Sequence, residues 1–266
     1  MAASDVDGAP LVQFSRHGGQ DEVALVTLNR PSKANAISPQ LLAEMNDTID
    51  AIASDSSVRA LVVTGAGKNF CSGGDLSSER PPDWITHVRG MFQRIEDLRM
   101  PTVAAVNGAA VAGGCELLLV FDLRVLADSA FISLPEVKFG AVTLAGTMQR
   151  LVKLIGLGRA KELNLLGDPV AADYAREIGL ANFVVPVDQV VPRALDIATT
   201  LASRDPVAMQ MTKMLLNVGA SADASLAAQL EAPIANLLLA DLSAKLASAA
   251  ASDPALRRIV ERNAAS

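Results

Sequence analysis

The sequence has few of the residues on which many functional sites depend. Its 266 residues include two histidines and two cysteines, and aromatic residues make up only 3%. Cys71 and Cys115 are too few for a disulfide framework, and no histidine stands near either of them to complete a metal-ligand cluster. Because aromatics are scarce, the core must be aliphatic, and a hydrophobic content of 50% is enough to build one.

An excess of positive charge is also missing. The formal net charge is −6, and no basic stripe is present to neutralise phosphates, which argues against a nucleic-acid partner. No segment has about 18 uninterrupted apolar residues, so no membrane span is expected. Residues 1–10 lack the basic start and apolar run of a signal peptide. These features predict a soluble cytoplasmic protein.

Apolar patterning predicts an α/β chain in three parts: a disordered segment 1–9, a mixed core 10–203 and a helical region 204–266. Ser38 is a candidate N-cap with Pro39 at the first helical position. The order strand, strand, helix recurs about three times, which indicates stacked layers. The predicted strands are 11–14, 23–28, 60–64, 102–106, 123–126, 130–132 and 181–187, and the other predicted helices are 84–100, 113–120, 146–155, 160–166, 190–203, 207–218, 224–247 and 254–261.

Two glycine-rich turns are the most informative motifs. Residues 69–75 read Asn-Phe-Cys-Ser-Gly-Gly-Asp, and residues 106–116 end in Gly-Gly-Cys-Glu. Glycines let the backbone approach a ligand and present its N–H groups. The first turn alone is also consistent with an ordinary Gly-Gly-Asp turn. The second turn stands between a predicted buried strand and a helix, so the Gly113 N–H is expected at a helix N-terminus, where an oxyanion is favoured.

Two glutamates follow these turns. Glu116 falls in the first turn of an apolar helix, where it is either a stabilising first-turn carboxylate or a part-buried acid–base group with a raised pKa. Glu136 follows Pro135 in an otherwise apolar stretch, and by itself it reads as a surface turn residue. Paired carboxylates beside an oxyanion site are the groups needed to form and protonate an enolate.

The sequence gives less support to a cysteine nucleophile or a dinucleotide-binding loop. A nucleophilic Cys71 needs a base, and His17 and His87 are placed in a hairpin turn and on a polar helix face. Gly156 and Gly158 have dinucleotide-loop spacing, but Lys161 stands where the third glycine belongs. This segment also follows a helix, so it is interpreted as a helix–helix turn.

Taken in order, these motifs resemble the enoyl-CoA hydratase/isomerase (crotonase) family over nearly the whole chain. Residues 28–31 with 35–37 resemble its first CoA-binding turn, and residues 70–75 and 107–116 resemble its two oxyanion turns. Pro135-Glu136 and Gln149-Arg150 complete the set. The resemblance implies a spiral of ββα units with a C-terminal helical trimerisation region, and a homotrimer or a hexamer made of two trimers.

The resemblance also implies an acyl-CoA thioester substrate, with coenzyme A as part of that substrate and no separate cofactor or metal. By the same resemblance, the N–H groups of Ser72 and Gly113 form the oxyanion hole, and Glu116 and Glu136 carry out the proton transfers of hydration. The resemblance places further substrate contacts at Ala34, Ala36, Cys71, Gly73, Gly74, Asp75, Gly114 and Gly140.

Enoyl-CoA hydration is the leading hypothesis. The alternatives are another enolate-forming acyl-CoA reaction, namely isomerisation, decarboxylation or thioester hydrolysis, and a non-catalytic CoA-binding subunit. Two regions depart from the family pattern. Residues 142–146 read Val-Thr-Leu-Ala-Gly where a proline and further glycines are usual, and the tail is alanine-rich. The acyl chain is therefore left open, and the loop 77–83 is expected to form part of the acyl-pocket wall.

Overall fold

The computed structural model describes residues 9–79 and 81–220. Internal contacts divide the chain into two units, Met1–Pro206 and Val207–Ser266. Of the predicted disordered segment 1–9, all but Ala9 lies outside the described residues, as do the helices predicted at 224–247 and 254–261. Within the described residues, no helix is long and apolar enough to cross a membrane.

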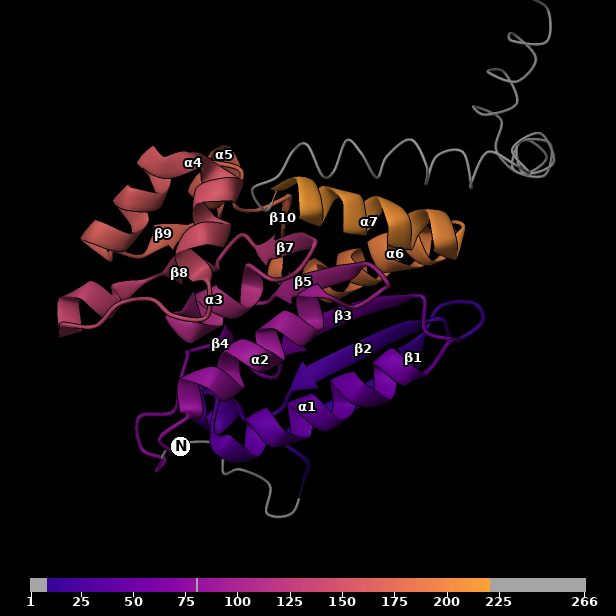
Figure 1. The fold of residues 1–266 in the computed structure, drawn as a ribbon, viewed down its shortest axis with the longest axis horizontal. Coiled ribbons are helices and arrows are strands. Elements are labelled where there is room, and N and C mark those ends of the chain that lie inside the picture. Colours follow the sequence, from indigo (N-terminus) through magenta and orange to yellow (C-terminus); the bar gives the residue numbers. More distant parts are fainter. Residues whose placement is uncertain (1–8, 80, 221–266) are drawn as a thin grey trace, which may run out of the picture. The chain divides into compact units, whose positions relative to one another are not determined.

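The first unit is built on a six-stranded sheet with the order β1-β2-β3-β5-β7-β10 (Figure 1). Strands β1 and β2 form an antiparallel hairpin, and every other neighbouring pair is parallel. Burial on both faces explains the largely apolar sequence of its central strands. Their bounds are β1 Val12–His17, β2 Val23–Leu28, β3 Ala60–Gly65, β5 Thr102–Val106, β7 Leu123–Ala127 and β10 Phe183–Val185.

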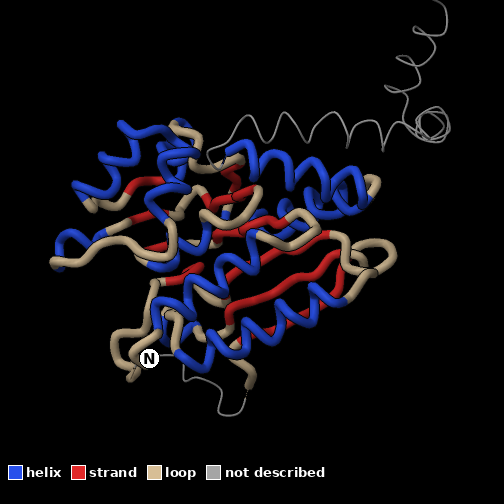
Figure 2. The backbone as a smooth tube through the Cα atoms, viewed as in Figure 1, coloured by secondary structure: helices blue, strands red, loops and turns tan. Residues whose placement is uncertain are grey.

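A second sheet has four short strands in the order β4-β6-β8-β9. Its strands are β4 Asn69–Cys71, β6 Ala109–Val111, β8 Phe131–Ser133 and β9 Val170–Ala171. The first three are parallel, and β9 pairs antiparallel with β8. The strands of both sheets are red in Figure 2, with blue helices around them.

Three successive ββα units connect the two sheets. Strands β3, β5 and β7 lie in the large sheet, and each is followed by a strand of the small sheet, β4, β6 or β8. A helix then completes each unit: α2 Trp84–Glu96, α3 Gly113–Leu118 or α4 Thr147–Leu166. The family resemblance implied a spiral of ββα units, although β4 and β6 were not predicted as strands. The repeat places the ends of three short strands next to one another.

The remaining helices of the first unit cover the sheet or join its strands, whereas α7, Pro206–Ala220, belongs almost entirely to the second unit. Helix α1, Pro39–Ser54, begins as predicted at Ser38, whose hydroxyl accepts the Leu41 N–H at 3.1 Å. Helix α6, Val190–Ala202, packs against strands β2, β3, β5 and β7. The others are α5 Ala172–Glu177 and the 3-10 helices η1 Pro31–Lys33, η2 Pro135–Phe139 and η3 Val187–Gln189.

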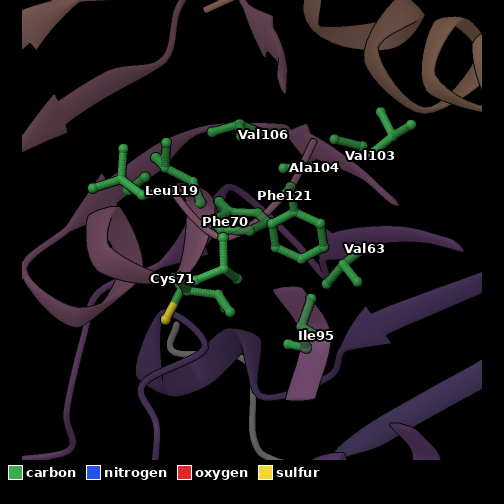
Figure 3. Packing of buried hydrophobic residues seen from close by; sticks show 14 of the residues in the cluster. Val63, Phe70, Cys71, Ile95, Val103, Ala104, Val106, Leu119 and Phe121 are labelled. Carbon is green, nitrogen blue, oxygen red and sulfur yellow. The ribbon is translucent and has the colours of Figure 1, made fainter. Parts of the chain in front are cut away.

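The core is aliphatic, with a few aromatic rings at its centre. Phe70 from β4 and Phe121 from the segment after α3 are both buried, and they lie among Val63, Ile95 and other apolar side chains (Figure 3). Phe70 immediately precedes the first glycine turn. The hydrophobic core therefore anchors the strand that carries this part of the site.

Some predicted element bounds are wrong. Helix α2 ends at Glu96 instead of running to Met100, because the segment before Pro101 leaves the helix and buries Leu98 and Met100. The strand predicted at 181–187 spans only Phe183–Val185. The two helices predicted at 146–155 and 160–166 are a single element with a break at Gly156, where φ is +75°. Strands β4, β6 and β9 and helix α5 were not predicted.

Candidate active site

The candidate site lies at the carboxyl edge of the small sheet. Because β4, β6 and β8 are parallel neighbours, their C-terminal ends lie side by side. The first leads into the turn 72–75, the second into α3 and the third into η2. A hydrogen bond of 2.9 Å from the Ala112 N–H to the Ser133 carbonyl ties the second end to the third. The fold thus brings together both glycine turns and both candidate glutamates.

The two glycine turns are in direct contact. A Cβ atom placed on Gly73 would lie 3.0 Å from the Gly113 nitrogen, and one placed on Gly113 would lie 3.3 Å from the Gly73 Cα. Gly73 also has a φ of +93°, a conformation that side chains disfavour. A Cβ atom on Gly114 would lie only 2.0 Å from the Cys71 carbonyl oxygen. Glycine is therefore required for the first turn of α3 to pack on β4.

Backbone strain marks the entry to α3. Ala112 has a φ of +50° and a ψ of −123°, which is unusual for a residue with a side chain. Such strain persists only where the surrounding structure fixes it, and it is concentrated at functional sites. In this structure it sets the direction of the chain just before Gly113, the first residue of α3.

The backbone N–H groups of the first turn differ in availability. The Ser72 N–H donates to the Ala34 carbonyl at 3.0 Å, so the structure does not leave it free for the oxyanion role expected from the sequence. The N–H groups of Gly74 and Gly113 have no hydrogen-bond partner among the described residues. The Gly74 nitrogen lies 3.5 Å from the position of a Cβ on Gly113, so these two groups are neighbours.

Glu116 is buried, with 5% of its surface exposed. Its Oε1 accepts the Leu144 N–H at 2.8 Å. Burial raises the pKa of this carboxyl to about 7, and the nearby charge of Glu136 acts in the same direction, while the Leu144 hydrogen bond partly offsets them. Glu116 is therefore a carboxyl group able to exchange a proton near neutral pH.

Glu136 is part-buried at the start of η2. Its Oε2 is buried and has no hydrogen-bond partner among the described residues. Burial also raises the pKa of Glu136. A buried, unpartnered carboxyl oxygen is costly, and it is commonly explained by a ligand or a catalytic role. The surface-turn interpretation considered for this residue does not fit its environment.

The remaining residues of the first turn have structural contacts. Asp75 is 5% exposed and accepts hydrogen bonds from Ser77 and Ser78, and its Oδ2 lies 2.6 Å from the Arg30 Nη1. These hydroxyl bonds, and then the guanidinium, lower the pKa of Asp75. The Cys71 side chain is fully buried in the core (Figure 3). The substrate contacts expected at these two residues are therefore unavailable to their side chains.

Three further expected contacts lie in different environments. Ala34 has a left-handed φ of +50° and caps η1, and its carbonyl oxygen accepts the hydrogen bond from the Ser72 N–H. Ala36 is buried beside it. Gly140 has a φ of +70°, caps η2 and is exposed, with open space around its α-carbon. None of these positions has been tested for substrate contact, so their roles stay predictions.

Sequence reasoning missed the groups that hold Glu116. Leu144, the donor to its carboxylate, lies in a segment that sequence analysis noted only as a departure from the family pattern. Arg150 was noted through the resemblance without a role, and in the structure it forms a two-point ion pair with Glu96 at 2.9 and 2.6 Å. Residue spacing gave no signal for Glu96, since 54 positions separate it from Arg150.

Comparisons with known proteins identify the family of this chain. The profile of the enoyl-CoA hydratase/isomerase family matches residues 18–246. A short-chain-enoyl-CoA hydratase of Clostridium acetobutylicum is 38% identical over 211 residues, which cover 77% of this chain and 81% of the relative. A crotonyl-CoA hydratase of Syntrophomonas wolfei is 35% identical over 228 residues, covering 83% and 88%.

A solved structure supports the same assignment. The crystal structure of an enoyl-CoA hydratase from Bacillus anthracis superimposes with a TM-score of 0.80 at 35% identity, covering 84% of this chain and 89% of that one. The chain belongs to the enoyl-CoA hydratase/isomerase family. Its fold is the crotonase-like spiral of ββα units that the sequence predicted.

Proposed function

We propose that this protein is an enoyl-CoA hydratase, which adds water across the 2,3 double bond of a 2-enoyl-CoA thioester to give a 3-hydroxyacyl-CoA. One observation carries the proposal. Buried Glu116 and part-buried Glu136, both with raised pKa values, stand at the same sheet edge as two backbone N–H groups that have no hydrogen-bond partner within residues 9–79 and 81–220. These are the groups required to activate water, stabilise an enolate and protonate it.

The thioester carbonyl binds between the N–H groups of Gly74 and Gly113. Gly74 takes the place expected for Ser72, because the Ser72 N–H is already bonded to Ala34. Negative charge develops on the carbonyl oxygen as water attacks, and backbone donors fixed in place stabilise that charge. Each donor of this kind is worth about 3 kcal/mol in the transition state.

The carboxylate of Glu116 accepts a proton from water as the water oxygen bonds to the β-carbon. The electron pair of the double bond moves to the thioester, giving an enolate. Glu136, in its protonated form, then delivers a proton to the α-carbon. Glu116 finishes protonated and Glu136 ionised, so the site is restored when Glu116 releases one proton and Glu136 takes one up. Burial raises the pKa of both carboxyl groups, to about 7 for Glu116, and this suits the two transfers.

Other reactions of an enolate are the second candidate. Isomerisation, decarboxylation and thioester hydrolysis all use the same oxyanion site. The buried Glu116, held by a dedicated hydrogen bond from Leu144, favours hydration because that reaction needs a second carboxylate to activate water. A non-catalytic CoA-binding subunit has no need of two carboxyl groups with raised pKa values.

We also propose that coenzyme A enters only as part of the substrate and that the protein is a cytoplasmic trimer or a pair of trimers. Helix α4 supports self-association, because large apolar side chains on it are exposed in a single chain. These are Met148, Val152, Leu157, Leu165 and Leu166. Light scattering tests the proposal, and a mass near that of one subunit would contradict it.

The deciding experiment is turnover of 2-enoyl-CoA thioesters from short to long chains, followed by loss of the conjugated thioester absorbance. Product mass should rise by one water, and the chain length with the highest kcat/KM identifies the preferred acyl group. Glu116→Gln is the matched control, since it keeps the side-chain shape but cannot accept the proton. Binding without turnover would reject hydration of these thioesters. Turnover to a product of unchanged mass would indicate isomerisation, and release of free coenzyme A would indicate thioester hydrolysis.

A further inference from the structure

We propose that Arg150 and Glu96 are positioning residues for Glu116, acting through the turn Leu144–Thr147. This inference rests on the proposed hydration reaction and adds two residues to it that do not contact the reacting atoms. The turn donates a backbone hydrogen bond to the Glu116 carboxylate, and the ion pair between Arg150 and Glu96 fixes the turn in the conformation that makes this possible.

The turn has an unusual conformation. Ala145 and Gly146 are consecutive residues in the left-handed region, with φ of +54° and +82°. The Thr147 N–H and hydroxyl both donate to the Leu144 carbonyl, at 3.0 and 2.6 Å. On the other side of the same residue, the Leu144 N–H donates to Glu116 at 2.8 Å. The orientation of this one donor thus depends on a strained backbone.

Arg150 reaches back from the first turns of α4 to hold that strained backbone. Its Nη1 donates to the Ala145 carbonyl at 2.5 Å, between the two left-handed residues. A Cβ on Gly146 would lie 2.9 Å from the same Nη1, so the guanidinium is packed against the turn. The carbonyl position, and with it the conformation of the turn, is therefore coupled to the position of one side chain.

Glu96 fixes that side chain. Its two carboxylate oxygens accept from Nε and Nη2 of Arg150 at 2.9 and 2.6 Å, and the two side chains are only 27% and 14% exposed. A two-point pair of this kind orients the guanidinium plane as well as attracting it. Because Glu96 lies at the end of α2, the ion pair connects the helix of one ββα unit to the active-site turn of another.

The position of the turn matters because the segment before it is exposed. The side chains of Val142 and Leu144 are 61% and 40% exposed and add little packing, whereas those of Thr143 and Ala145 are buried. The backbone of Leu144 is therefore held from one side by packing and from the other by polar contacts. The other polar anchor is a 3.3 Å hydrogen bond from the Thr143 hydroxyl to Asn164. A displacement of about 1 Å in a catalytic group can lower the rate about 100-fold. Loss of the ion pair is therefore expected to lower kcat by displacing the Glu116 carboxylate.

The test compares Arg150→Met, Arg150→Lys and Glu96→Gln with the wild type, using the best enoyl-CoA from the substrate panel. We expect kcat to fall about 10-fold to 100-fold in Arg150→Met, with KM near the wild-type value. Lysine keeps the charge but cannot make the two-point contact, so Arg150→Lys should recover only part of the loss. Glu162→Gln breaks an exposed ion pair with Arg159 on the same helix and should leave kcat unchanged.

The pH profile separates positioning from a simple charge effect. The charged groups that act on Glu116 are Glu136 and Arg150. Arg150→Met removes a positive charge, which should raise the pKa of Glu116 and move the acidic limb of the profile to higher pH. Glu96→Gln removes a negative charge and should move the acidic limb to lower pH or leave it in place. A positioning role predicts that both variants lose limiting kcat at their own optimum pH, whichever way the profile moves.

Three results would overturn the inference. The first is that Arg150→Met and Glu96→Gln shift the pH profile in opposite directions while their limiting kcat stays at the wild-type value. The second is that the variants have a lower melting temperature but an unchanged kcat per folded enzyme. The third is that Glu96→Gln has full activity. If Arg150→Met does not fold, the milder Glu96→Gln and Arg150→Lys still decide the outcome. Failure of the wild type to hydrate any enoyl-CoA would instead reject the proposed function. Hydration by the wild type with unaffected variants would reject only the positioning role.

Discussion

The two halves of the candidate site are built in different ways. The oxyanion half consists of backbone, with Gly73, Gly113 and Gly114 packed so closely that a single added Cβ atom would meet a neighbour within 3.3 Å. The carboxylate half consists of side chains, Glu116 and Glu136, whose surroundings include an exposed segment and a strained turn. Core packing fixes the first half, whereas hydrogen bonds and one ion pair fix the second.

This difference determines how each half tolerates change. Among single substitutions only proline removes a backbone N–H, and any other substitution moves the donor only by changing the packing around it. A carboxylate is removed by a single substitution, and its orientation depends on a few polar contacts. The oxyanion half should therefore respond to changes of volume, and the carboxylate half should respond to changes of charge and of hydrogen bonding.

The largest expected effect is the loss of either carboxylate. Glu116→Gln and Glu136→Gln should each lower kcat for hydration about 10²-fold to 10⁴-fold, because a general acid or base contributes that much. The two variants should differ in α-proton exchange of a saturated acyl-CoA in deuterated water. Glu116→Gln should keep this exchange and Glu136→Gln should lose it, as measured by mass spectrometry. Unchanged hydration in both variants would remove the carboxylate half from the mechanism.

A change of volume tests the oxyanion half. Gly114→Ala places a Cβ 2.0 Å from the Cys71 carbonyl oxygen, so the start of α3 must move away from β4. We expect a loss of about 1–3 kcal/mol in the free energy of unfolding. We also expect a fall in kcat of about 100-fold, since displacement of the first turn of α3 separates the two donors. Chemical denaturation and turnover assays measure the two effects.

Gly90→Ala is the matched control for that variant. Gly90 lies in α2 and is exposed, and a Cβ on it would have nothing within 4 Å. Alanine is the better helix former, so this change should stabilise the protein by up to about 1 kcal/mol and leave kcat alone. Equal behaviour of the two variants would show that the close packing at Gly114 does not hold the oxyanion half in place.

The pH dependence should be intermediate in size. Because the pKa of Glu116 is about 7 and its ionised form is the base, kcat/KM should be about tenfold lower at pH 6 than its limit at higher pH. Since the folded-state pKa is raised, the folded state binds more protons than the unfolded state between pH 4.5 and 7. Relative to Glu116→Gln, wild-type stability should therefore fall by roughly 3 kcal/mol as pH rises through this window.

Two measurements check these pH effects. The pH–rate profile of the wild type should show an acidic limb near pH 7. The profile of the residual activity in Glu116→Gln should lack this limb. Denaturation at a series of pH values should show the wild type losing unfolding free energy relative to Glu116→Gln as the pH rises from 4.5 to 7. A stability difference that stays constant from pH 4.5 to 8 would mean that Glu116 titrates as an exposed carboxyl group.

The smallest effect is expected at the cysteines, which stand beside both glycine turns. Cys71 and Cys115 are fully buried, and burial raises the pKa of Cys71 to about 12 and that of Cys115 well above its usual value. Iodoacetamide should therefore leave the mass and activity of the folded protein unchanged, while both thiols react in denaturant. Activity lost in step with alkylation of the folded protein would place a thiol in the site.

Sequence reasoning located the chemistry of the site better than its supports. The two glycine turns, Glu116 and Glu136 were identified because glycine runs and carboxylates in apolar surroundings are conspicuous locally. The first oxyanion donor was assigned to Ser72, and the structure leaves Gly74 free instead. The difference depends on the Ala34 carbonyl, 38 positions away, and no local pattern reports such a contact.

Element types were predicted well and element ends less well. Apolar runs gave both strands of only one ββα unit, β7 and β8, because these runs are properties of short segments. The spiral of ββα units was implied by the family resemblance. Short strands such as β4, with three residues, were missed because they form only through pairing with β6. The early end of α2 depends on burial of Leu98 and Met100, which is a property of the assembled core.

By itself, the sequence determined an aliphatic α/β chain, most of its longer elements and the residue types of the proposed enolate-forming site. These follow from periodicity, glycine conformational freedom and the chemistry of carboxylates, all of which act over a few residues. Only the tertiary structure decided which N–H groups are free, how strongly Glu116 and Glu136 are buried, and that Glu96 holds Arg150. Burial and hydrogen-bond pairing join segments tens of residues apart, so their effects on pKa and position exist only once the parallel strand ends are assembled.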